Sequence, residues 1–354
     1  MPPSPGLSDS TLRQIVHVSI GGSRLRIRIS NAFGDKPLSI LSVHVAVSLG
    51  LSRISVPSDK AVTFNGRGSV IIPEGAPIES DPVAFPLAPL SNLAITMHVA
   101  DSSSAVTAHP GSRETSYLQA DDAVSAPQLP SAVQTVHWYF VNGVDVTGPA
   151  GSASVAALGD SITDGRGSTT DGNDRWPDEL ARRLRTDKNT ADIGVLNEGV
   201  GGNRLLQDGL GPNALARLDR DVLAQTAVRW LIVLEGINDI GTASGNAEDI
   251  IGAYNQLILR AHAHGIRVYG GTILPYEGAA YFSPTGEAIR QKVNEWIRSS
   301  GKFDAVIDWD KVMRDREHPL RLAAAVDSGD HLHPSAAGYE KLANAIDLRL
   351  FEER

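Results

Sequence analysis

The sequence contains no cysteine among its 354 residues. This absence excludes disulfide bridges, thiolate metal ligands and a cysteine nucleophile, although it does not identify a cellular compartment. No run of about 18 apolar residues occurs, so we expect no membrane insertion. Aromatic residues make up only 5% of the chain, and the five tryptophans are too scattered to indicate a sugar-binding platform.

Positive charge is in the minority. The 32 Lys and Arg residues against 41 Asp and Glu residues give a formal net charge of −9, which argues against nucleic-acid binding. Hydrophobic residues at 42% and charged residues at 21% are typical of a folded chain. Because a single core stops growing at roughly 250–300 residues, the length predicts two domains or one large domain with a substantial extension, of which we favour two. No feature of the sequence indicates an oligomeric state.

The first part of the chain is dominated by a period of two, which is typical of β-strands. Residues 24–29 alternate arginine with Leu or Ile, and a second apolar alternation at 16–20 precedes Gly21-Gly22, so together they predict a β-hairpin. Similar short runs recur as far as residue 141. We predict an all-β sandwich (jelly-roll-like) domain over residues 1–148, with the arginine stripe on its solvated outer face.

Beyond a loop-like segment around residue 150, short apolar strands alternate with amphipathic helices, which predicts a second domain over 149–354. The expected helices run from about residue 250 to Gly265, from Ser283 to Gly301, and from Pro334 to Leu350. This alternation predicts a doubly wound, flavodoxin-like α/β domain with a five-stranded parallel sheet. Its strands are expected at 154–158, 194–197, 230–234, 267–272 and 303–307.

Ligands of such a sheet bind beyond the carboxyl ends of its strands, so the segments that follow the strands are where chemistry is expected. The segments after the first three strands are Gly159-Asp160-Ser161-Ile162, Asn197-Glu198-Gly199-Val200-Gly201-Gly202-Asn203 and Gly236-Ile237-Asn238-Asp239, and a fourth block, Asp330-His331-Leu332-His333, stands ahead of the last helix. Together the four blocks supply a nucleophile, neutral hydrogen-bond donors and an acid–histidine pair, which is the set that acyl transfer needs.

Ser161 is the candidate nucleophile, because a serine at a tight strand-to-helix turn keeps its hydroxyl free, although a serine there can also simply cap the helix. The candidate base is His333 or His331, and the candidate orienting acid is Asp330 or Asp327, since all four lie in one loop. The three-residue offset between Asp330 and His333 lets the carboxylate reach back to the imidazole and fix its tautomer.

Three groups are candidate donors of an oxyanion hole: the N–H groups of Ser161 and Gly202, and the side-chain amide of Asn238. The alternative for Asn238-Asp239 is an ordinary turn, and we expect a structural role for Asp239. The glycines at 199–202 lack the spacing of a dinucleotide or phosphate site, so we expect no cofactor.

These blocks resemble, in the right order, the four signature blocks of the GDSL or SGNH hydrolases. The resemblance spans about residues 154–345 and implies a serine hydrolase of carboxylic esters. It puts the family's invariant residues on Ser161, Gly202, Asn238 and His333, and its spacing favours Asp330 as the partner of His333. Ile162 replaces the leucine of the older family name, and Gly201 stands where serine is frequent; both are common variants.

The first part of the chain also resembles, through stretches such as 24–33, the β-sandwich that precedes the hydrolase domain in a branch of microbial lipases, acylhydrolases and xylan-associated esterases. That resemblance implies a small-molecule or carbohydrate ester substrate. The branch is mostly secreted, whereas residues 1–6 have neither the basic nor the apolar segment of a signal peptide. A mature secreted protein and a cytoplasmic one are therefore both compatible with the sequence.

The polar entrance, rich in Gly and Asn and without an evident lid, favours short acyl groups such as acetyl esters of sugars. A lipase of longer chains is the alternative within the enzymes. The alternative from another class is a non-catalytic carbohydrate-binding protein on a hydrolase scaffold, against which the complete set of catalytic residue types argues.

Asp160, Asn203 and His109 are candidate substrate contacts, and for His109 an ordinary surface turn is the simpler interpretation. The acidic residues at 171, 174 and 178 follow no calcium-loop pattern, so we expect no metal site.

Overall fold

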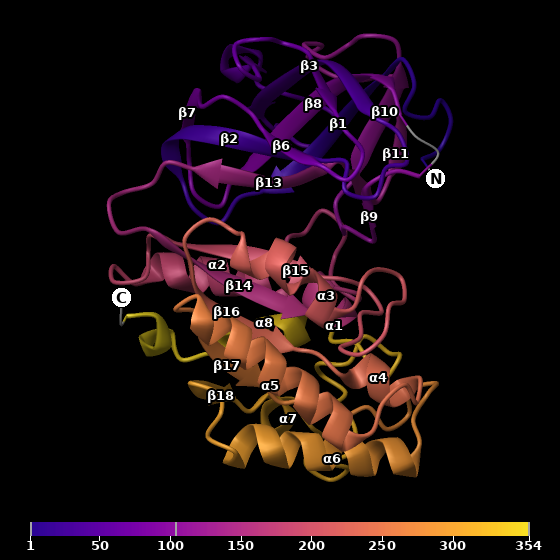
Figure 1. The fold of residues 1–354 in the computed structure, drawn as a ribbon, viewed down its shortest axis with the longest axis vertical. Coiled ribbons are helices and arrows are strands. Elements are labelled where there is room, and N and C mark those ends of the chain that lie inside the picture. Colours follow the sequence, from indigo (N-terminus) through magenta and orange to yellow (C-terminus); the bar gives the residue numbers. More distant parts are fainter. Residues whose placement is uncertain (1, 103–104, 353–354) are drawn as a thin grey trace. The chain divides into compact units, whose positions relative to one another are not determined.

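The computed structural model describes residues 2–102 and 105–352 and contains two compact units (Figure 1). The first unit comprises residues 1–150 together with 170–172, and the second comprises 151–169 together with 173–354. Each unit has its own hydrophobic core.

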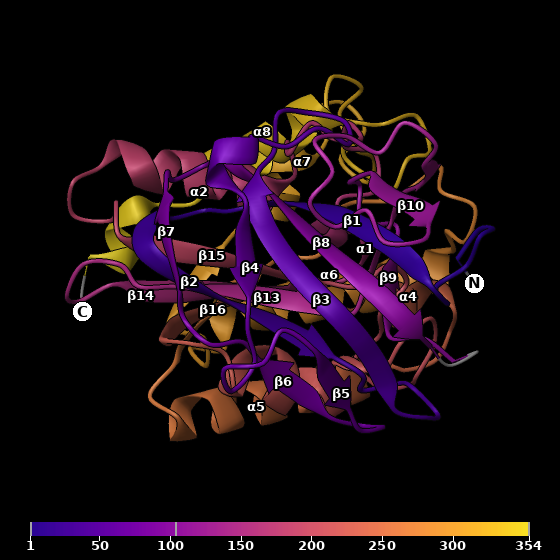
Figure 2. The same ribbon diagram turned by 90° about the horizontal axis from the view of Figure 1, so that it is seen from above.

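Antiparallel sheets build the first unit (Figure 2). The larger sheet has the order β11-β10-β1-β8-β3-β4, with β5 also paired to β3; the second has the order β13-β2-β6, with β7 also paired to β2; and β9 pairs with β12. Leu12 and Ile40 of the larger sheet share one core with Ile27 and Phe85 of the second, so the predicted all-β sandwich is confirmed. The strands are β1 (Ser10–His17), β2 (Gly22–Ser30), β3 (Leu38–Val47), β4 (Lys60–Val62), β5 (Val70–Ile72), β6 (Pro77–Glu79), β7 (Val83–Leu87), β8 (Asn92–Asp101), β9 (Ala108–Pro110), β10 (Ser116–Ala120), β11 (Val133–Thr135), β12 (His137–Tyr139) and β13 (Val141–Val146), and a short 3₁₀ turn lies at Val56–Ser58.

The predicted hairpin across Gly21-Gly22 is wrong. β1 pairs with β8 and β10, whereas β2 pairs with β13, β6 and β7, so the chain crosses here from one sheet to the other. A side chain at Gly21 would collide with the carbonyl of Leu87, and one at Gly22 with the carbonyl of Thr147. The two glycines therefore serve a close approach of backbones rather than a two-residue hairpin turn.

The arginine stripe of β2 faces solvent only in part. Arg24 and Arg26 are exposed as predicted, whereas Arg28 is buried and lies 3.9 Å from Asp145. Arg28 passes over Gly143, where an added Cβ would lie 3.0 Å from its Nε. The missing side chain at Gly143 therefore leaves room for the guanidinium, and alternation alone could not reveal this.

Five parallel strands form the sheet of the second unit, in the order β15-β14-β16-β17-β18. This order, with the first strand between the second and the third, is the flavodoxin-like arrangement that the sequence predicted. The strands are β14 (Ala153–Gly159), β15 (Ile193–Gly199), β16 (Val228–Leu234), β17 (Arg267–Gly271) and β18 (Ala305–Ile307).

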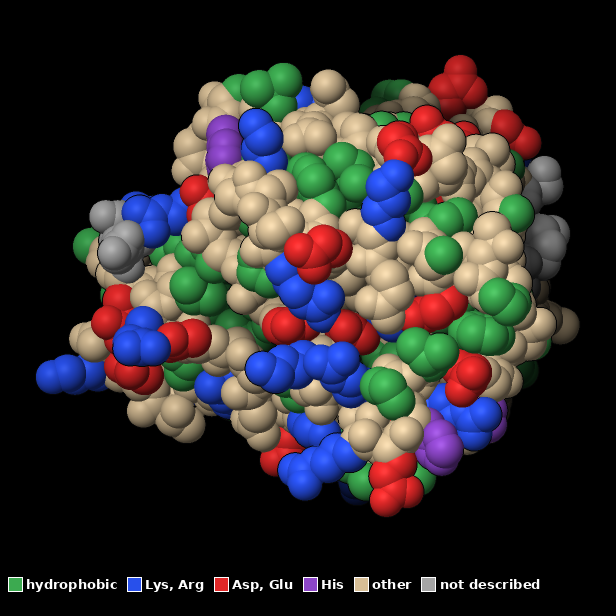
Figure 3. Space-filling view, turned by 90° about the horizontal axis from the view of Figure 1, so that it is seen from below, with side chains coloured by type: hydrophobic (Ala, Val, Ile, Leu, Met, Phe, Trp, Pro, Cys, Tyr) green, Lys and Arg blue, Asp and Glu red, His purple; other side chains and the backbone are tan. Residues whose placement is uncertain are grey.

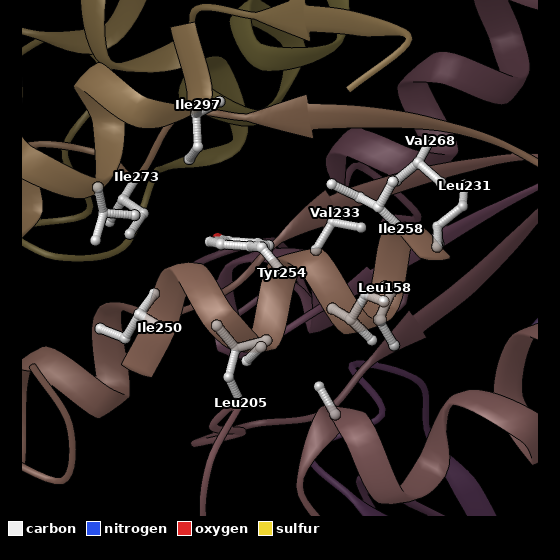
Figure 4. Close-up of a cluster of buried hydrophobic side chains, with 14 of the residues drawn as sticks. Leu158, Leu205, Leu231, Val233, Ile250, Tyr254, Ile258, Val268, Ile273 and Ile297 are labelled. Atoms are coloured by element: carbon white, nitrogen blue, oxygen red, sulfur yellow. The ribbon is translucent and has the colours of Figure 1, made fainter. Parts of the chain in front are cut away.

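Helices cover both faces of this sheet. On one face Tyr254 and Ile258 pack against Leu231, Val233 and Val268 of the central strands (Figure 4). On the other face, apolar side chains of the sheet pack in a second hydrophobic cluster with the tryptophans at 176 and 309. The helices are α1 (Ser161–Asp164), α2 (Trp176–Thr186), α3 (Ala214–Leu218) followed by a π-helical turn (Asp219–Leu223), α4 (Ile237–Gly241), α5 (Ala247–Ala263), α6 (Pro284–Ser299), α7 (Trp309–Met313) and α8 (Ala336–Asn344), followed by a 3₁₀ turn (Leu348–Phe351).

The ends of two predicted helices agree with the structure, and one does not. Gly265 adopts a φ of +71° just past α5, and the Ser283 hydroxyl caps α6 by accepting from the N–H of Gly286 at 3.0 Å. The last helix was predicted to reach Leu350 but ends at Asn344. Arg183 of α2 donates to the carbonyl oxygens of residues 343 and 346, so these carbonyls bond outside a helix.

Charges of both signs lie next to one another on the face of the molecule shown in Figure 3. Two ion pairs of α6 show the same mixing: Lys292 pairs with Glu248 of α5, and Arg298 pairs with Asp308 at 2.7 Å. The net negative charge of the chain is therefore not gathered into one acidic surface on this face. Across residues 2–102 and 105–352, each helix is too short or too polar to cross a membrane.

Candidate active site

The turn from β14 into α1 presents Ser161. Asp160 caps this short helix by accepting from the N–H of Ile162 at 2.9 Å, and Ser161 is its first residue. A Cβ on Gly159 would collide with the Thr163 hydroxyl, so the tightness of the turn requires glycine there. Ser161 as a whole is 9% exposed.

The side chains of Ser161, His333 and Asp330 form one hydrogen-bonded series. Ser161 Oγ lies 2.8 Å from His333 Nε2, and His333 Nδ1 lies 2.6 Å from Asp330 Oδ2. His333 comes from the loop before α8 and is 4% exposed. The three side chains, from residues up to 172 positions apart in the sequence, are therefore arranged as a nucleophile, its base and an orienting acid would be.

Asp330 is held as a carboxylate. Burial would raise the pKa of this side chain, but the backbone N–H and the imidazole of His333, together with the N–H of Leu332, lower the pKa to about 2. The two backbone N–H groups share Oδ1, at 2.8 and 3.1 Å, which leaves Oδ2 for the imidazole. An ionised Asp330 fixes the Nδ1–H tautomer of His333 and leaves Nε2 able to accept a proton.

The other candidates in the same loop form a pair of their own. His331 Nδ1 lies 2.7 Å from Asp327 Oδ2, and the backbone N–H of His331 donates to Oδ1 of the same carboxylate at 3.1 Å. His331 adopts a left-handed φ of +62°, and a Cβ on Gly278 would lie 2.9 Å from its ring. Ser161 is thus bonded to His333, while His331 lies against the loop that follows β17.

The three predicted oxyanion donors follow neighbouring strands. Gly202 adopts a φ of +71°, and neither its N–H nor that of Ser161 has a hydrogen-bond acceptor within the part of the chain that the structure describes. Asn238 donates through Nδ2 to the carbonyl of Asn203 at 3.0 Å, which uses one of its two amide hydrogens. The hydroxyl of Tyr281 donates to Asn238 Oδ1 at 3.4 Å. Both contacts orient the amide.

Arg217, which sequence reasoning missed, joins the strands that carry these groups. Its guanidinium is fully buried and donates to the carbonyl of Gly159 at the end of β14 (3.0 Å) and to that of Glu198 near the end of β15 (2.7 Å). It also donates to Asn203 Oδ1 at 2.9 Å and lies 3.5 Å from Glu235, which follows β16. Its position on a short helix gave no sequence signal of this role.

Buried carboxyls lie behind the nucleophile. Asp160 and Glu235 are each 1% exposed, and one oxygen of each has no hydrogen-bond partner among the described residues. Burial raises the pKa of Asp160 to about 7, and burial and the neighbouring Asp160 raise that of Glu235 well above its usual value. Asp239 accepts from the N–H groups of residues 205 and 206, in the structural position that the sequence analysis expected.

The predicted substrate contacts lie in different surroundings. Asp160 and Asn203 are each 1% exposed, and the Asn203 amide is bonded to Arg217 and to the carbonyl of Pro212. His109 lies on β9 of the first unit, opposite Trp138 of β12. Sequence reasoning expected a polar entrance, but Leu210 is 82% exposed and lies against Gly202.

The acidic residues after α1 are engaged in hydrogen bonds and an ion pair within the chain. Asp171 accepts from the N–H and hydroxyl of Thr115, Asp174 from the N–H of Thr169, and Asp178 pairs with Arg175. Over the described residues the structure has no group of three or more His, Asp or Glu side chains that could hold a metal ion.

Comparison with known proteins relates the part of the chain that carries this site to one family. The model of the GDSL-like Lipase/Acylhydrolase family matches residues 157–341, which include Ser161, Gly202, Asn238, Asp330 and His333. No curated protein sequence matches the chain significantly.

Several solved structures are similar to part of the chain. A GDSL-like lipase from Bacteroides thetaiotaomicron is 19% identical over 56% of this chain and 87% of its own, with a TM-score of 0.42. An aryl esterase from M. smegmatis is 18% identical over 56% and 99%, with a TM-score of 0.46. An acetylxylan esterase from Geobacillus stearothermophilus is 23% identical over 56% and 94%, with a TM-score of 0.44.

Proposed function

Because the chain belongs to the GDSL-like lipase/acylhydrolase family and is a carboxylic ester hydrolase, we propose that it is a serine esterase of short acyl esters. The observation that carries the proposal is the series of hydrogen bonds from Ser161 Oγ through His333 to Asp330, at 2.8 and 2.6 Å. Short acyl groups on sugars, acetyl among them, are the substrates we favour, since the segments that follow the strands are rich in glycine and asparagine.

In the proposed reaction Ser161 Oγ attacks the ester carbonyl carbon as its proton passes to His333 Nε2. The negative charge that develops on the carbonyl oxygen is stabilised by the N–H groups of Ser161 and Gly202 and by the Asn238 amide. One such donor is typically worth about 2.7–4 kcal/mol in the transition state. Ionised Asp330 stabilises the imidazolium, which the low pKa of this carboxyl supports.

The intermediate then collapses, and the bond between the carbonyl carbon and the alcohol oxygen breaks. His333 returns its proton to that oxygen, and the alcohol leaves. A water molecule, deprotonated by His333, attacks the acyl-enzyme and releases the carboxylic acid with Ser161 restored. In this scheme Asp160 and Asn203 are positioning residues: Asp160 caps the helix of the nucleophile, and Asn203 joins Arg217 to the loop of Gly202.

The test is the initial hydrolysis rate of p-nitrophenyl esters from acetyl to palmitoyl, for the parent and Ser161→Ala. We expect parent activity to be highest with short acyl groups, and Ser161→Ala to lose at least about 10⁴-fold because the nucleophile is gone. Activity that rises with chain length would identify a lipase instead. Equal rates for parent and variant would refute the assignment of Ser161 and would favour a carbohydrate-binding protein without catalysis.

A further inference from the structure

The segment 204–213, between β15 and α3, is a compact loop with its own hydrogen bonds. Asp208 Oδ1 accepts from the backbone and side-chain nitrogens of Asn213, both at 2.8 Å, and these bonds lower the pKa of the Asp208 carboxyl. The N–H of Gly209 donates to the carbonyl of Gly211 at 3.0 Å, and the N–H of Ala214 donates to that of residue 204 at 2.9 Å. The backbone of the loop therefore keeps its shape without help from the side chain at its tip.

That tip carries Leu210. At 82% exposure it is the most exposed large hydrophobic residue in the described part of the chain. A single exposed leucine is ordinary on a protein surface, so exposure alone assigns no role. Leu210 is distinguished by its neighbour Gly202: Cδ1 of Leu210 lies 3.2 Å from the point that a Cβ on Gly202 would occupy. An apolar side chain thus borders the glycine whose N–H is a proposed oxyanion donor.

The topology indicates which part of an ester would meet this side chain. Gly202 follows β15 and Ser161 follows β14, while His331, in the loop of His333, contacts Gly278 beyond β17. In the strand order, β15 and β17 lie on opposite sides of β14. The alcohol oxygen must approach His333, which returns the proton to it. With the alcohol oxygen at His333 and the carbonyl oxygen held in part by the Gly202 N–H, the acyl chain is the substituent of the carbonyl carbon that is left to meet the side chain beside Gly202.

We propose that Leu210 is a specificity-determining residue that contacts the first methylene groups of the acyl chain. The inference rests on the proposed function and specifies its substrate class: acyl groups with a few carbons beyond the carbonyl bury these against Leu210, whereas an acetyl group is too short to do so. Methylene contacts of this kind discriminate substrates in proportion to the apolar area they bury. A single, largely exposed leucine provides one such contact rather than a tunnel.

The test compares Leu210→Ala with a matched control, Leu259→Ala. Leu259 is also an exposed leucine, at 62%, but it lies near the last turn of α5, which starts at the carboxyl edge of the sheet and runs away from it. We measure kcat/KM for p-nitrophenyl acetate, butyrate and hexanoate, and for a series of acetates with different alcohols. Thermal unfolding checks that each variant is folded.

We expect Leu210→Ala to lower kcat/KM about three- to tenfold for butyrate and hexanoate and less than about twofold for every acetate, since only the longer acyl groups lose a contact. Leu259→Ala should match the parent on all substrates. An equal loss on acetate and hexanoate, a loss that follows the alcohol, or no loss would each overturn the inference. If Ser161→Ala kept full activity, the proposed function itself would fail, so the two failures are distinguishable.

Discussion

Two histidine–carboxylate pairs stand in the loop before α8, and their burial is reversed. In the pair of Asp330 and His333 the imidazole side chain is 5% exposed and the carboxylate 41%. In the pair of Asp327 and His331 the imidazole is 53% exposed and the carboxylate 8%. The bonds to Nδ1, at 2.6 and 2.7 Å, are nearly equal. A carboxylate that orients an imidazole therefore does not by itself make a base, and the bond to Ser161 distinguishes the two.

The largest expected difference between the two pairs is in kcat, when each histidine is replaced in turn. His333→Ala removes the group bonded to Ser161 Oγ, so we expect kcat for a short p-nitrophenyl ester to fall at least about 10⁴-fold. His331→Ala should change kcat less than about threefold. Single-turnover and steady-state rates of the two variants measure this directly. A comparable loss from both would mean that the pairs act together, contrary to the assignment of His333 alone.

Replacing the carboxylates should give a smaller difference of the same kind. Asp330→Asn leaves an amide that no longer fixes the Nδ1–H tautomer of His333, so we expect kcat to fall about 10²- to 10⁴-fold, less than for the histidine. Asp327→Asn, the matched control, should leave kcat within about threefold of the parent. The assignment would be wrong if Asp327→Asn cost as much as Asp330→Asn.

The smallest effects are expected on stability. Two carboxyls near Ser161 should make the free energy of unfolding change with pH in opposite directions. The pKa of Asp330 is about 2, below its ordinary 3.8, because bonds from His333 outweigh burial; burial raises that of Asp160 to about 7. At Asp330 the unfolded chain binds more protons, so its stabilising contribution is present above the ordinary pKa and is lost as pH falls through the folded one. At Asp160 the folded chain binds more protons, so stability is lost as pH rises towards 7.

Unfolding free energies of the parent, Asp330→Asn and Asp160→Asn, measured between about pH 2 and pH 8, check both signs. The parent's advantage over Asp330→Asn should shrink towards low pH, by less than about 1 kcal/mol because this half-exposed carboxyl is screened by solvent. Its advantage over Asp160→Asn should shrink from pH 4 to 7, on the order of 1–3 kcal/mol. Asparagine also caps helices, so the cap of α1 is retained. If the two differences in unfolding free energy changed with pH in the same direction, the two pKa shifts would be contradicted.

Sequence reasoning worked where the local pattern and the fold agree. The apolar strands of the second unit, the glycine after α5 and the serine cap of α6 all follow from short-range preferences that burial reinforces. The blocks after the first three strands could be found because a parallel sheet brings their ends together, whereas the block of Asp330 and His333 precedes α8 and was found through its acid–histidine spacing.

Sequence reasoning failed where the structure of a segment depends on a contact with a distant part of the chain. The glycines at 21–22 looked like a hairpin turn, but they make room for backbone from residues 87 and 147. Arg183 bonds two carbonyls at the end of α8, and the missing side chain at Gly143 leaves room for the buried Arg28. Arg217 and Leu210 carry no local signal, since their roles depend on neighbours that only the folded chain supplies.

Arg217 has a further consequence for how such a site can change. One guanidinium bonds the carbonyls of Gly159 and Glu198, which precede the nucleophile and the donor loop. The exposed tip of the loop 204–213, around Leu210, lies outside these anchored positions, so side chains there can be exchanged while the serine and its donors keep their places. For protein engineering, that loop is the natural place to graft new acyl preferences onto an unaltered reaction centre.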